Sequence, residues 1–196
     1  MKATMKTLSA ILICCFISTI QMYGENIQRP ESENYVKGVE ALNEGNPEAA
    51  YTYLNAEINE HPDNGYAHCY MALICNFCND TKLALQALNS SLELIPEADT
   101  EYRSFAHYSR GVLLSNLKMW ERAEADLNEA IRLNPEDVEN YKSRAQLYFE
   151  TERYEESLDD LTRALKLDSK ADVNDLMLQL MAVAHPSDVM ERITGR

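Results

Sequence analysis

The sequence is poor in the residues that form irregular chain and in the motifs that mark common enzymes. It contains six Gly and six Pro in 196 residues, so little of it is expected to be loop. It has no glycine-rich phosphate loop, no Ser–His–Asp order typical of hydrolases and no pair of His at metal-binding spacing. The length and the 45% hydrophobic content suffice for one domain with a continuous core. Nothing in the composition therefore points to an enzyme, a metal site or a bound cofactor.

Positive charge is also scarce. The chain has 18 Lys and Arg against 32 Asp and Glu, which gives a formal net charge of −14. Because an acidic surface repels phosphate backbones, we do not expect a nucleic-acid partner. The acidity itself names no partner and is typical of a solvated surface.

The N-terminus has its own pattern. Lys2 and Lys6 precede the apolar run LSAILICCFISTI (8–20), which is followed by the more polar QMYGEN. A run of this length is too short to span a bilayer, which takes about 20 residues. The pattern predicts a secretory signal peptide over residues 1–24. Such a protein is exported, and so is periplasmic or secreted; the alternative is an uncleaved N-terminal anchor that holds it at the membrane.

Two further features of this segment bear on its processing. Cys14 and Cys15 raise the possibility of lipidation, but Ile13 is a poor residue to precede a lipidated cysteine. Removal of residues 1–24 takes away two lysines and no acids, so the mature charge would be −14 − 2 = −16.

The rest of the chain repeats itself. Four segments end in nearly the same way, and their starts lie 34, 39 and 34 residues apart: NAEINEHPDN (55–64), NSSLELIPEA (89–98), NEAIRLNPED (128–137) and TRALKLDSKA (162–171). These endings define four blocks of the same length, 31–64, 65–98, 104–137 and 138–171, with five extra residues at 99–103.

Aligned positions in the four blocks carry similar residues, and the role of each position in helix packing explains its residue type. Small residues at positions 8 and 20 let two helices approach closely where they cross: Gly38, Ala72, Gly111 and Ala145, and Ala50, Ala84, Ala123 and Ser157. Leu at position 24 and an aliphatic residue at position 28 form a stripe one helical turn apart. Turn residues fall near position 15, and Pro at position 32 ends the second helix in three blocks. Each block therefore predicts a helix–turn–helix unit that buries its apolar stripe by stacking on its neighbours.

On these residues the chain resembles the tetratricopeptide-repeat family over residues 31–171. It departs from the family at position 4, often Trp there, and at position 27, where Glu57 and Ser91 stand in the first two blocks. The resemblance implies an all-α, right-handed superhelical solenoid of four repeats. Residues 25–30 would be a short linker, and residues 172–196 would form C-terminal capping helices.

The resemblance also implies a concave groove lined mainly by the first helix of each block. Positions 2, 5, 9 and 12 would line it: Ser32, Tyr35, Val39 and Leu42; Tyr66, Cys69, Leu73 and Asn76; Phe105, Tyr108, Val112 and Ser115; Glu139, Lys142, Gln146 and Phe149. The first three sets are largely aromatic and aliphatic, which argues against the carboxylate clamp of chaperone-binding members. An apolar groove suits an amphipathic helix or an extended apolar peptide, with tyrosines as anchors. Alternatively, some of these side chains fill the core or lie under a terminal segment.

The cysteines offer a different interpretation. Cys75 and Cys78 form a CNFC pair, with Cys69 nearby, which raises the hypothesis of a redox factor. However, the pair falls at the end of a helix, whereas an activated thiol belongs at its start. A structural zinc site needs four ligands, and there is only one such pair. A disulfide between the two remains possible.

The C-terminal segment VNDLMLQLMAVAH (173–185) predicts another helix, apolar on most of its sides. Pro186 ends it, and SDVMERI (187–193) predicts a short last helix. We expect a non-catalytic scaffold for a protein or peptide, without a small-molecule substrate. The alternative is a structural subunit that acts through this apolar helix. The sequence leaves the partner and the oligomeric state open.

Overall fold

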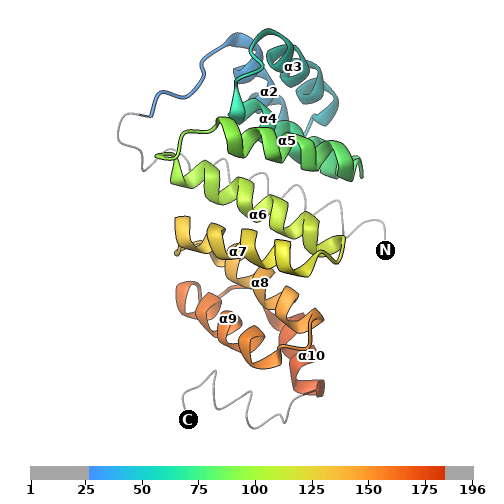
Figure 1. Cartoon of the computed structure of the whole chain (residues 1–196), viewed down its shortest axis with the longest axis vertical. Helices are drawn as coiled ribbons and strands as arrows, with labels where there is room; N and C mark the ends of the chain where they lie inside the picture. The colour runs from blue at the N-terminus through green and yellow to red at the C-terminus, as the bar shows by residue number, and fades with distance from the viewer. Residues whose placement is uncertain (1–26, 184–196) are drawn as a thin grey trace. The chain divides into compact units, whose positions relative to one another are not determined.

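The computed structural model describes residues 27–183, and this part of the chain consists of helices joined by short turns, with no strand (Figure 1). The helices are α2 (Glu33–Asn43), α3 (Pro47–Glu60), α4 (Gly65–Phe77), α5 (Thr81–Leu94), α6 (Thr100–Asn116), α7 (Trp120–Leu133), α8 (Val138–Glu150), α9 (Tyr154–Leu167) and α10 (Asn174–Val183). The predicted signal peptide, residues 1–24, and the predicted last helix, residues 187–193, lie outside the described residues. Between residues 27 and 183, no helix has the length and apolarity needed to cross a membrane.

Each repeat block holds one pair of helices, so the all-α class is confirmed. The chain divides into two compact units: unit 1 extends to Ala106 and unit 2 begins at His107, within α6. Unit 1 contains α2 to α5, and unit 2 contains α7 to α10. The handedness of the superhelix stays a prediction.

The turn inside each repeat has the same backbone geometry. Position 15 lies in the left-handed region in all four repeats, at Gly45 (φ 72°), Asn79 (φ 61°), Lys118 (φ 58°) and Glu152 (φ 62°). The N–H of the following residue then donates to a carbonyl five residues back, as Asn46 does to Ala41 at 2.8 Å and Arg153 to Tyr148 at 2.8 Å. This pattern satisfies carbonyls that the end of the first helix would otherwise leave without a partner.

Side chains in the turns start the next helices. Asn46 accepts a hydrogen bond from the N–H of Ala49 (3.1 Å) at the start of α3, and Asp80 does so from Leu83 (3.0 Å) at the start of α5. Asn64 caps α4 in the same way through Ala67 (3.1 Å). Such caps satisfy orphan N–H groups and explain why helices begin at these residues.

The core lies where the two helices of a repeat cross. The leucines at position 24, which are Leu54, Leu88, Leu127 and Leu161, are each at most 1% exposed. A Cβ added to Gly38 would lie 2.7 Å from Leu54 Cγ, which is closer than packed atoms approach. The small residues predicted at the crossings therefore do lie there, and they set the distance between the helices.

Both departures from the family pattern are accommodated by polar contacts. At position 4, His68 Nε2 lies 2.9 Å from the Pro62 carbonyl oxygen, and the Tyr141 hydroxyl donates to the Pro135 carbonyl at 3.1 Å. At position 27, Glu57 is buried and accepts a hydrogen bond from Asn64 Nδ2 at 2.8 Å. These contacts tie one repeat to the turn that precedes the next.

The five extra residues lengthen a helix instead of forming a loop. Helix α6 begins at Thr100, four residues before the start of the third block. Asp99 stabilises this start, because its Oδ1 accepts from the N–H of Tyr102 (3.3 Å) and its carbonyl accepts from Arg103 (3.0 Å). The insertion thus adds a helical turn that carries Tyr102 into unit 1.

Helix α10 caps the last repeat in unit 2. Leu176, Met177 and Leu180 are buried in one cluster with Leu158 and Leu161 of α9. Leu178 points away from this cluster and is 65% exposed, and Val183, the last residue of the helix, is 52% exposed. The helix therefore buries one apolar face and leaves Leu178 in solvent on the opposite face.

Candidate partner-binding site

In unit 1, the residues predicted to line the groove differ in exposure. Tyr35, Leu42, Tyr66 and Cys69 are buried, whereas Val39, Leu73, Phe105 and Ser32 are partly exposed and Asn76 is exposed. The partly exposed group lies on the first helices α2, α4 and α6 and at the residue before α2. Surface for a partner is thus offered mainly by Val39, Leu73 and Phe105.

The buried tyrosines belong to a cluster that the sequence pattern did not predict. The rings of Tyr66 and Tyr102 meet edge to face at 4.8 Å, and Tyr70 lies 6.2 Å from Tyr102 and 6.1 Å from Tyr35. The hydroxyl oxygens of Tyr70 and Tyr102 are 2.9 Å apart. Burial raises the pKa of all four phenols above the ordinary value, so each stays neutral and available for hydrogen bonding.

A buried carboxylate, Asp99, organises the cluster. Only 1% of Asp99 is exposed, and its Oδ2 accepts hydrogen bonds from the Tyr66 hydroxyl (3.0 Å) and Arg29 Nε (3.3 Å). Arg29 also donates to Glu101 at 3.2 Å and lies 4.7 Å from the centroid of the Tyr102 ring. Burial alone would lower the pKa of Arg29, but the bonds to Asp99 outweigh it and raise that pKa. Arg29 therefore fixes the segment before α2 to the start of α6 as a permanently charged clamp.

In unit 2, the predicted lining residues are mostly partly exposed, namely Tyr108, Val112, Ser115, Glu139, Lys142, Gln146 and Phe149. Burial raises the pKa of Tyr108 above its ordinary value. Lys142 Nζ donates to Glu139 at 2.8 Å and Gln146 Nε2 to Glu150 at 3.0 Å, each within α8. The polar side chains of the fourth repeat are therefore paired with each other within α8. The aromatic and aliphatic residues of unit 2 form its partly exposed apolar surface.

The cysteines do not form an activated pair. Cys69 and Cys75 are buried, Cys78 is exposed, and all three are free thiols. Burial raises the pKa of Cys69 to about 12 and also raises that of Cys75, which is the reverse of what a nucleophilic thiolate needs. Among residues 27–183, no three His, Cys, Asp or Glu side chains are grouped so that they could hold a metal ion.

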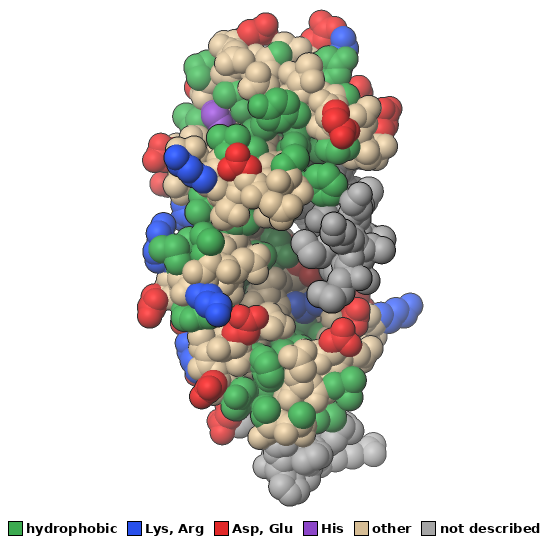
Figure 2. Space-filling view, turned by 90° about the vertical axis from the view of Figure 1, so that its right-hand side faces the viewer, with side chains coloured by type: hydrophobic (Ala, Val, Ile, Leu, Met, Phe, Trp, Pro, Cys, Tyr) green, Lys and Arg blue, Asp and Glu red, His purple; other side chains and the backbone are tan. Residues whose placement is uncertain are grey.

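Four residues of the cluster were absent from the residues expected at the site: Arg29, Tyr70, Asp99 and Tyr102. Tyr70 lies at position 6 of the second block, which was not among the positions predicted to line the groove, and the other three lie outside the repeat blocks. A usable signal was present at Asp99, because an acid just before a helical segment is typical of an N-cap. Figure 2 shows that hydrophobic side chains also reach the surface in groups between acidic and basic ones.

Comparison with known families and proteins gave matches over part of the chain. Two models described as tetratricopeptide repeat match residues 104–137 and 138–170. The lipoprotein NlpI homolog of Haemophilus influenzae is 31% identical over 87 residues, covering 44% of this chain and 28% of that protein. Human tetratricopeptide repeat protein 6 is 24% identical over 142 residues, covering 72% of this chain and 26% of that protein. The chain thus spans only about a quarter of the length of either curated relative.

Solved structures show the same fold at low sequence identity. MamA from Desulfovibrio magneticus RS-1 superposes with a TM-score of 0.68 at 20% identity, covering 83% of this chain and 90% of that one. YrrB, described as a TPR protein with an unusual peptide-binding site, has a TM-score of 0.59 at 21% identity. That match covers 70% of this chain and 68% of YrrB. Similarity at this level establishes the fold of the described helices.

Proposed function

We propose that this chain, in which two tetratricopeptide-repeat models match residues 104–137 and 138–170, is a non-catalytic scaffold. It binds an amphipathic helix or an extended apolar peptide of a protein partner on its first helices. Proteins built from these repeats bind protein or peptide partners, and they generally act as scaffolds rather than enzymes. The observation that carries the finer proposal is the set of apolar side chains left partly exposed on α2, α4, α6 and α8.

Each unit has its own first-helix residues with apolar side chains at the surface. In unit 1, Val39, Leu73 and Phe105 offer apolar contact area, and Asp99 joins the starts of α4 and α6 through its hydrogen bonds with Tyr66 and Tyr102. In unit 2, Tyr108 and Val112 offer apolar area on α6, and Lys142 and Gln146 offer polar contacts on α8. A rigid apolar surface with a few polar groups favours a helix or peptide over a charged ligand.

Site-specific photocrosslinking tests the proposal while the partner is still unidentified. A photoreactive amino acid is placed at Leu73 or Val112, and, as the matched control, at Leu94 or Leu117, which are exposed and lie outside the first-helix positions. We expect one partner protein to be crosslinked from Leu73 and Val112 and not from the controls. Crosslinking to the same partner from Leu94 and Leu117 alone would place binding elsewhere and refute the groove.

Once the partner is identified, its affinity tests the aromatic residues. Tyr108→Ala should weaken binding by about 1–3 kcal/mol, the range of interface hot spots. Tyr35→Ala and Tyr66→Ala should weaken binding mainly through lost stability, because both side chains are buried. A melting experiment on each variant separates these two effects.

We also propose that the protein is exported and works in the cell envelope or outside the cell. Lys2, Lys6 and the apolar run 8–20 support this, and a relative from Haemophilus influenzae is named a lipoprotein. Cell fractionation with N-terminal sequencing tests it, and a mature protein that starts at Glu25 is the expected result. A product that starts at Met1 in the cytoplasmic fraction would contradict it.

One observation favours a second candidate, a structural subunit that acts through α10. Leu178 is the most exposed large hydrophobic residue among those described, at 65%. In that case Leu178→Gln would abolish assembly with the partner and Tyr108→Ala would leave it intact. The groove proposal expects the opposite result for the two variants.

A further inference from the structure

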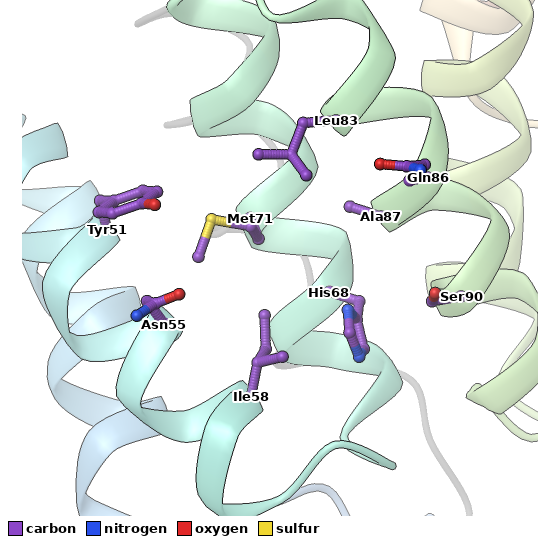
Figure 3. Close-up of a pocket in the computed structure, with 9 residues that line it drawn as sticks. All are labelled: Tyr51, Asn55, Ile58, His68, Met71, Leu83, Gln86, Ala87 and Ser90. Atoms are coloured by element: carbon purple, nitrogen blue, oxygen red, sulfur yellow. The ribbon is translucent and has the colours of Figure 1, made fainter.

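Unit 1 has a second surface feature, a pocket of about 210 Å³ on the side of the second helices (Figure 3). Helix α3 forms one wall and α5 the other, and α4 lies between them (Figure 3). The lining side chains are Tyr51, Asn55 and Ile58 on α3, His68 and Met71 on α4, and Leu83, Gln86, Ala87 and Ser90 on α5. All the helices that form it belong to unit 1, and none of these residues was expected to line the groove.

The pocket exists because the second repeat lacks an ion pair that the third and fourth repeats have. In the third repeat, Arg110 donates two hydrogen bonds to Asp126 at 2.7 and 2.8 Å, from position 7 to position 23. In the fourth repeat, Arg144 and Asp160 make the same pair at 2.8 and 2.7 Å. In the second repeat these positions are Met71 and Ala87, both of which line the pocket. The shorter and uncharged pair leaves space where the long Arg side chain lies in the other two repeats.

The chemistry of the lining suits an apolar side chain carried by a peptide. No Asp, Glu, Lys or Arg lines the pocket, although 26% of the chain is charged. The volume is below the roughly 300 Å³ at which small-molecule sites begin. Tyr51 and Leu83 stand on opposite walls at 45% and 39% exposure. Asn55 and Gln86, also on opposite walls, add exposed amides that can bond to the polar groups of a peptide.

The charges around the pocket favour a basic occupant. Helices α3 and α5 run the same way, because each is joined to α4 by a short turn and packs against it. Glu60 and Glu93 lie at the carbonyl ends of these helices, where Arg103 of α6 donates to two carbonyl oxygens at the end of α5 at 2.8 and 3.0 Å. At the opposite end, Glu48 and the N-cap residue Asp80 lie with Lys82. Acidic side chains therefore outnumber basic ones at both ends of the pocket.

We propose that this pocket binds a basic amphipathic helix of a protein partner, with one Leu, Ile, Met or Phe side chain inserted between Tyr51 and Leu83. Lys or Arg residues of this helix lie beside Glu60 and Glu93 at one end of the pocket and beside Glu48 and Asp80 at the other, so that the charges are complementary. A second copy of the chain is disfavoured as the occupant, because each copy carries a net charge of −14. The scaffold would then hold partners on two separate surfaces.

A designed peptide tests this directly with the full chain. The probe is a fluorescent peptide of about four helical turns with Leu along one face, Gln elsewhere and Lys in its first and last turns. Binding is followed by fluorescence anisotropy and mapped by NMR chemical shifts. We expect shifts on α3 and α5, and weaker binding when the Lys residues are replaced by Glu.

The decisive variant is M71R/A87D, which installs in the second repeat the ion pair found in the third and fourth. It fills the pocket with a pair that this fold already accommodates, and circular dichroism and melting confirm that the protein stays folded. We expect it to weaken peptide binding by about tenfold or more, the loss expected when a central hot spot is removed. The matched control, Leu117→Gln, alters an exposed apolar side chain outside the pocket and should leave binding unchanged.

Two outcomes would overturn the proposal. One is equal peptide binding by the parent and by M71R/A87D. The other is concentration-dependent self-association of the parent that M71R/A87D abolishes, since the pocket would then receive a second copy. Neither depends on the first-helix surface, because partner crosslinking from Leu73 and Val112 tests that surface separately.

Discussion

Gly111 lies against Leu127 so closely that a Cβ on Gly111 would be 2.9 Å from Leu127 Cγ. Gly38 and Leu54 repeat the relationship in the first block, with a distance of 2.7 Å. Leu127 and Leu54 are fully buried, so neither has free space to move into. The absence of a side chain at position 8 is therefore what brings the two helices of these repeats together.

The first prediction follows from this contact. Gly111→Leu should destabilise the protein by at least about 1–3 kcal/mol, because the added side chain overpacks the crossing. Leu127→Ala should cost about 2–5 kcal/mol through the cavity it leaves. The double variant should be more stable than the sum of the two losses predicts, since one change makes room for the other. Urea unfolding measures all three, and strict additivity would show that the two residues do not share a crossing.

The second prediction concerns the turn inside each repeat. Lys118 has a positive φ of 58°, which costs about 1–2 kcal/mol for a residue with a Cβ and nothing for Gly. Lys118→Gly should therefore be more stable than Lys118→Ala by about 1 kcal/mol in thermal or urea unfolding. Gly45→Ala should lower the free energy of unfolding by a similar amount, because Gly45 has the same backbone conformation in the first repeat. Equal stability of the Gly and Ala variants at 118 would contradict the turn geometry.

The third prediction concerns pH. Burial raises the pKa of Asp126, but hydrogen bonds from Arg110 and His107 outweigh it and hold that pKa below its ordinary value. A lowered folded-state pKa contributes stability that is present above the unfolded value of about 3.9 and is lost as the pH falls through the folded value. Asp126→Asn should therefore be less stable than the parent at neutral pH, and the difference should narrow below about pH 4.

Asp160 provides the control for this pH experiment. Burial raises its pKa, and the bonds from Arg144 do not reverse that shift. Its ionisation therefore contributes no stability that acid would remove, and the loss caused by Asp160→Asn should not narrow on acidification. Unfolding curves measured between neutral and acid pH check both variants, and identical profiles would show that the two pairs are equivalent.

The fourth prediction concerns the cysteines. Cys78 is exposed, whereas Cys69 is 1% exposed and burial raises its pKa to about 12. Because the thiolate is the reactive form, iodoacetamide should modify Cys78 in the folded protein and should reach Cys69 only after unfolding. Peptide mapping by mass spectrometry after timed labelling measures both rates. Rapid labelling of Cys69 in the native protein would revive the redox hypothesis.

The repeat and its helix pairs were predictable from the sequence, because they depend on interactions between residues close in the chain. Turn residues, position-8 and position-20 small residues and the leucine stripe recur at one period, and each acts within a single helix–turn–helix unit. The same period is enough to predict a helix crossing at Gly111. The sequence predicted the place of each turn but not its full geometry, because Lys118 and Glu152 have the left-handed backbone conformation, which their residue types do not favour.

The tertiary structure alone decided which side chains form each surface. Tyr35 and Tyr66 were predicted as groove anchors, but Asp99, Tyr70 and Tyr102 bury them in a cluster that joins residues more than 30 positions apart. The insertion at 99–103 does not follow the repeat period, so periodicity could not show that it lengthens α6 and carries Tyr102 inward. The pocket depends likewise on what Met71 and Ala87 fail to fill between α3 and α5. Local patterns determine where helices begin, end and cross, whereas long-range packing determines which side chains are left for a partner.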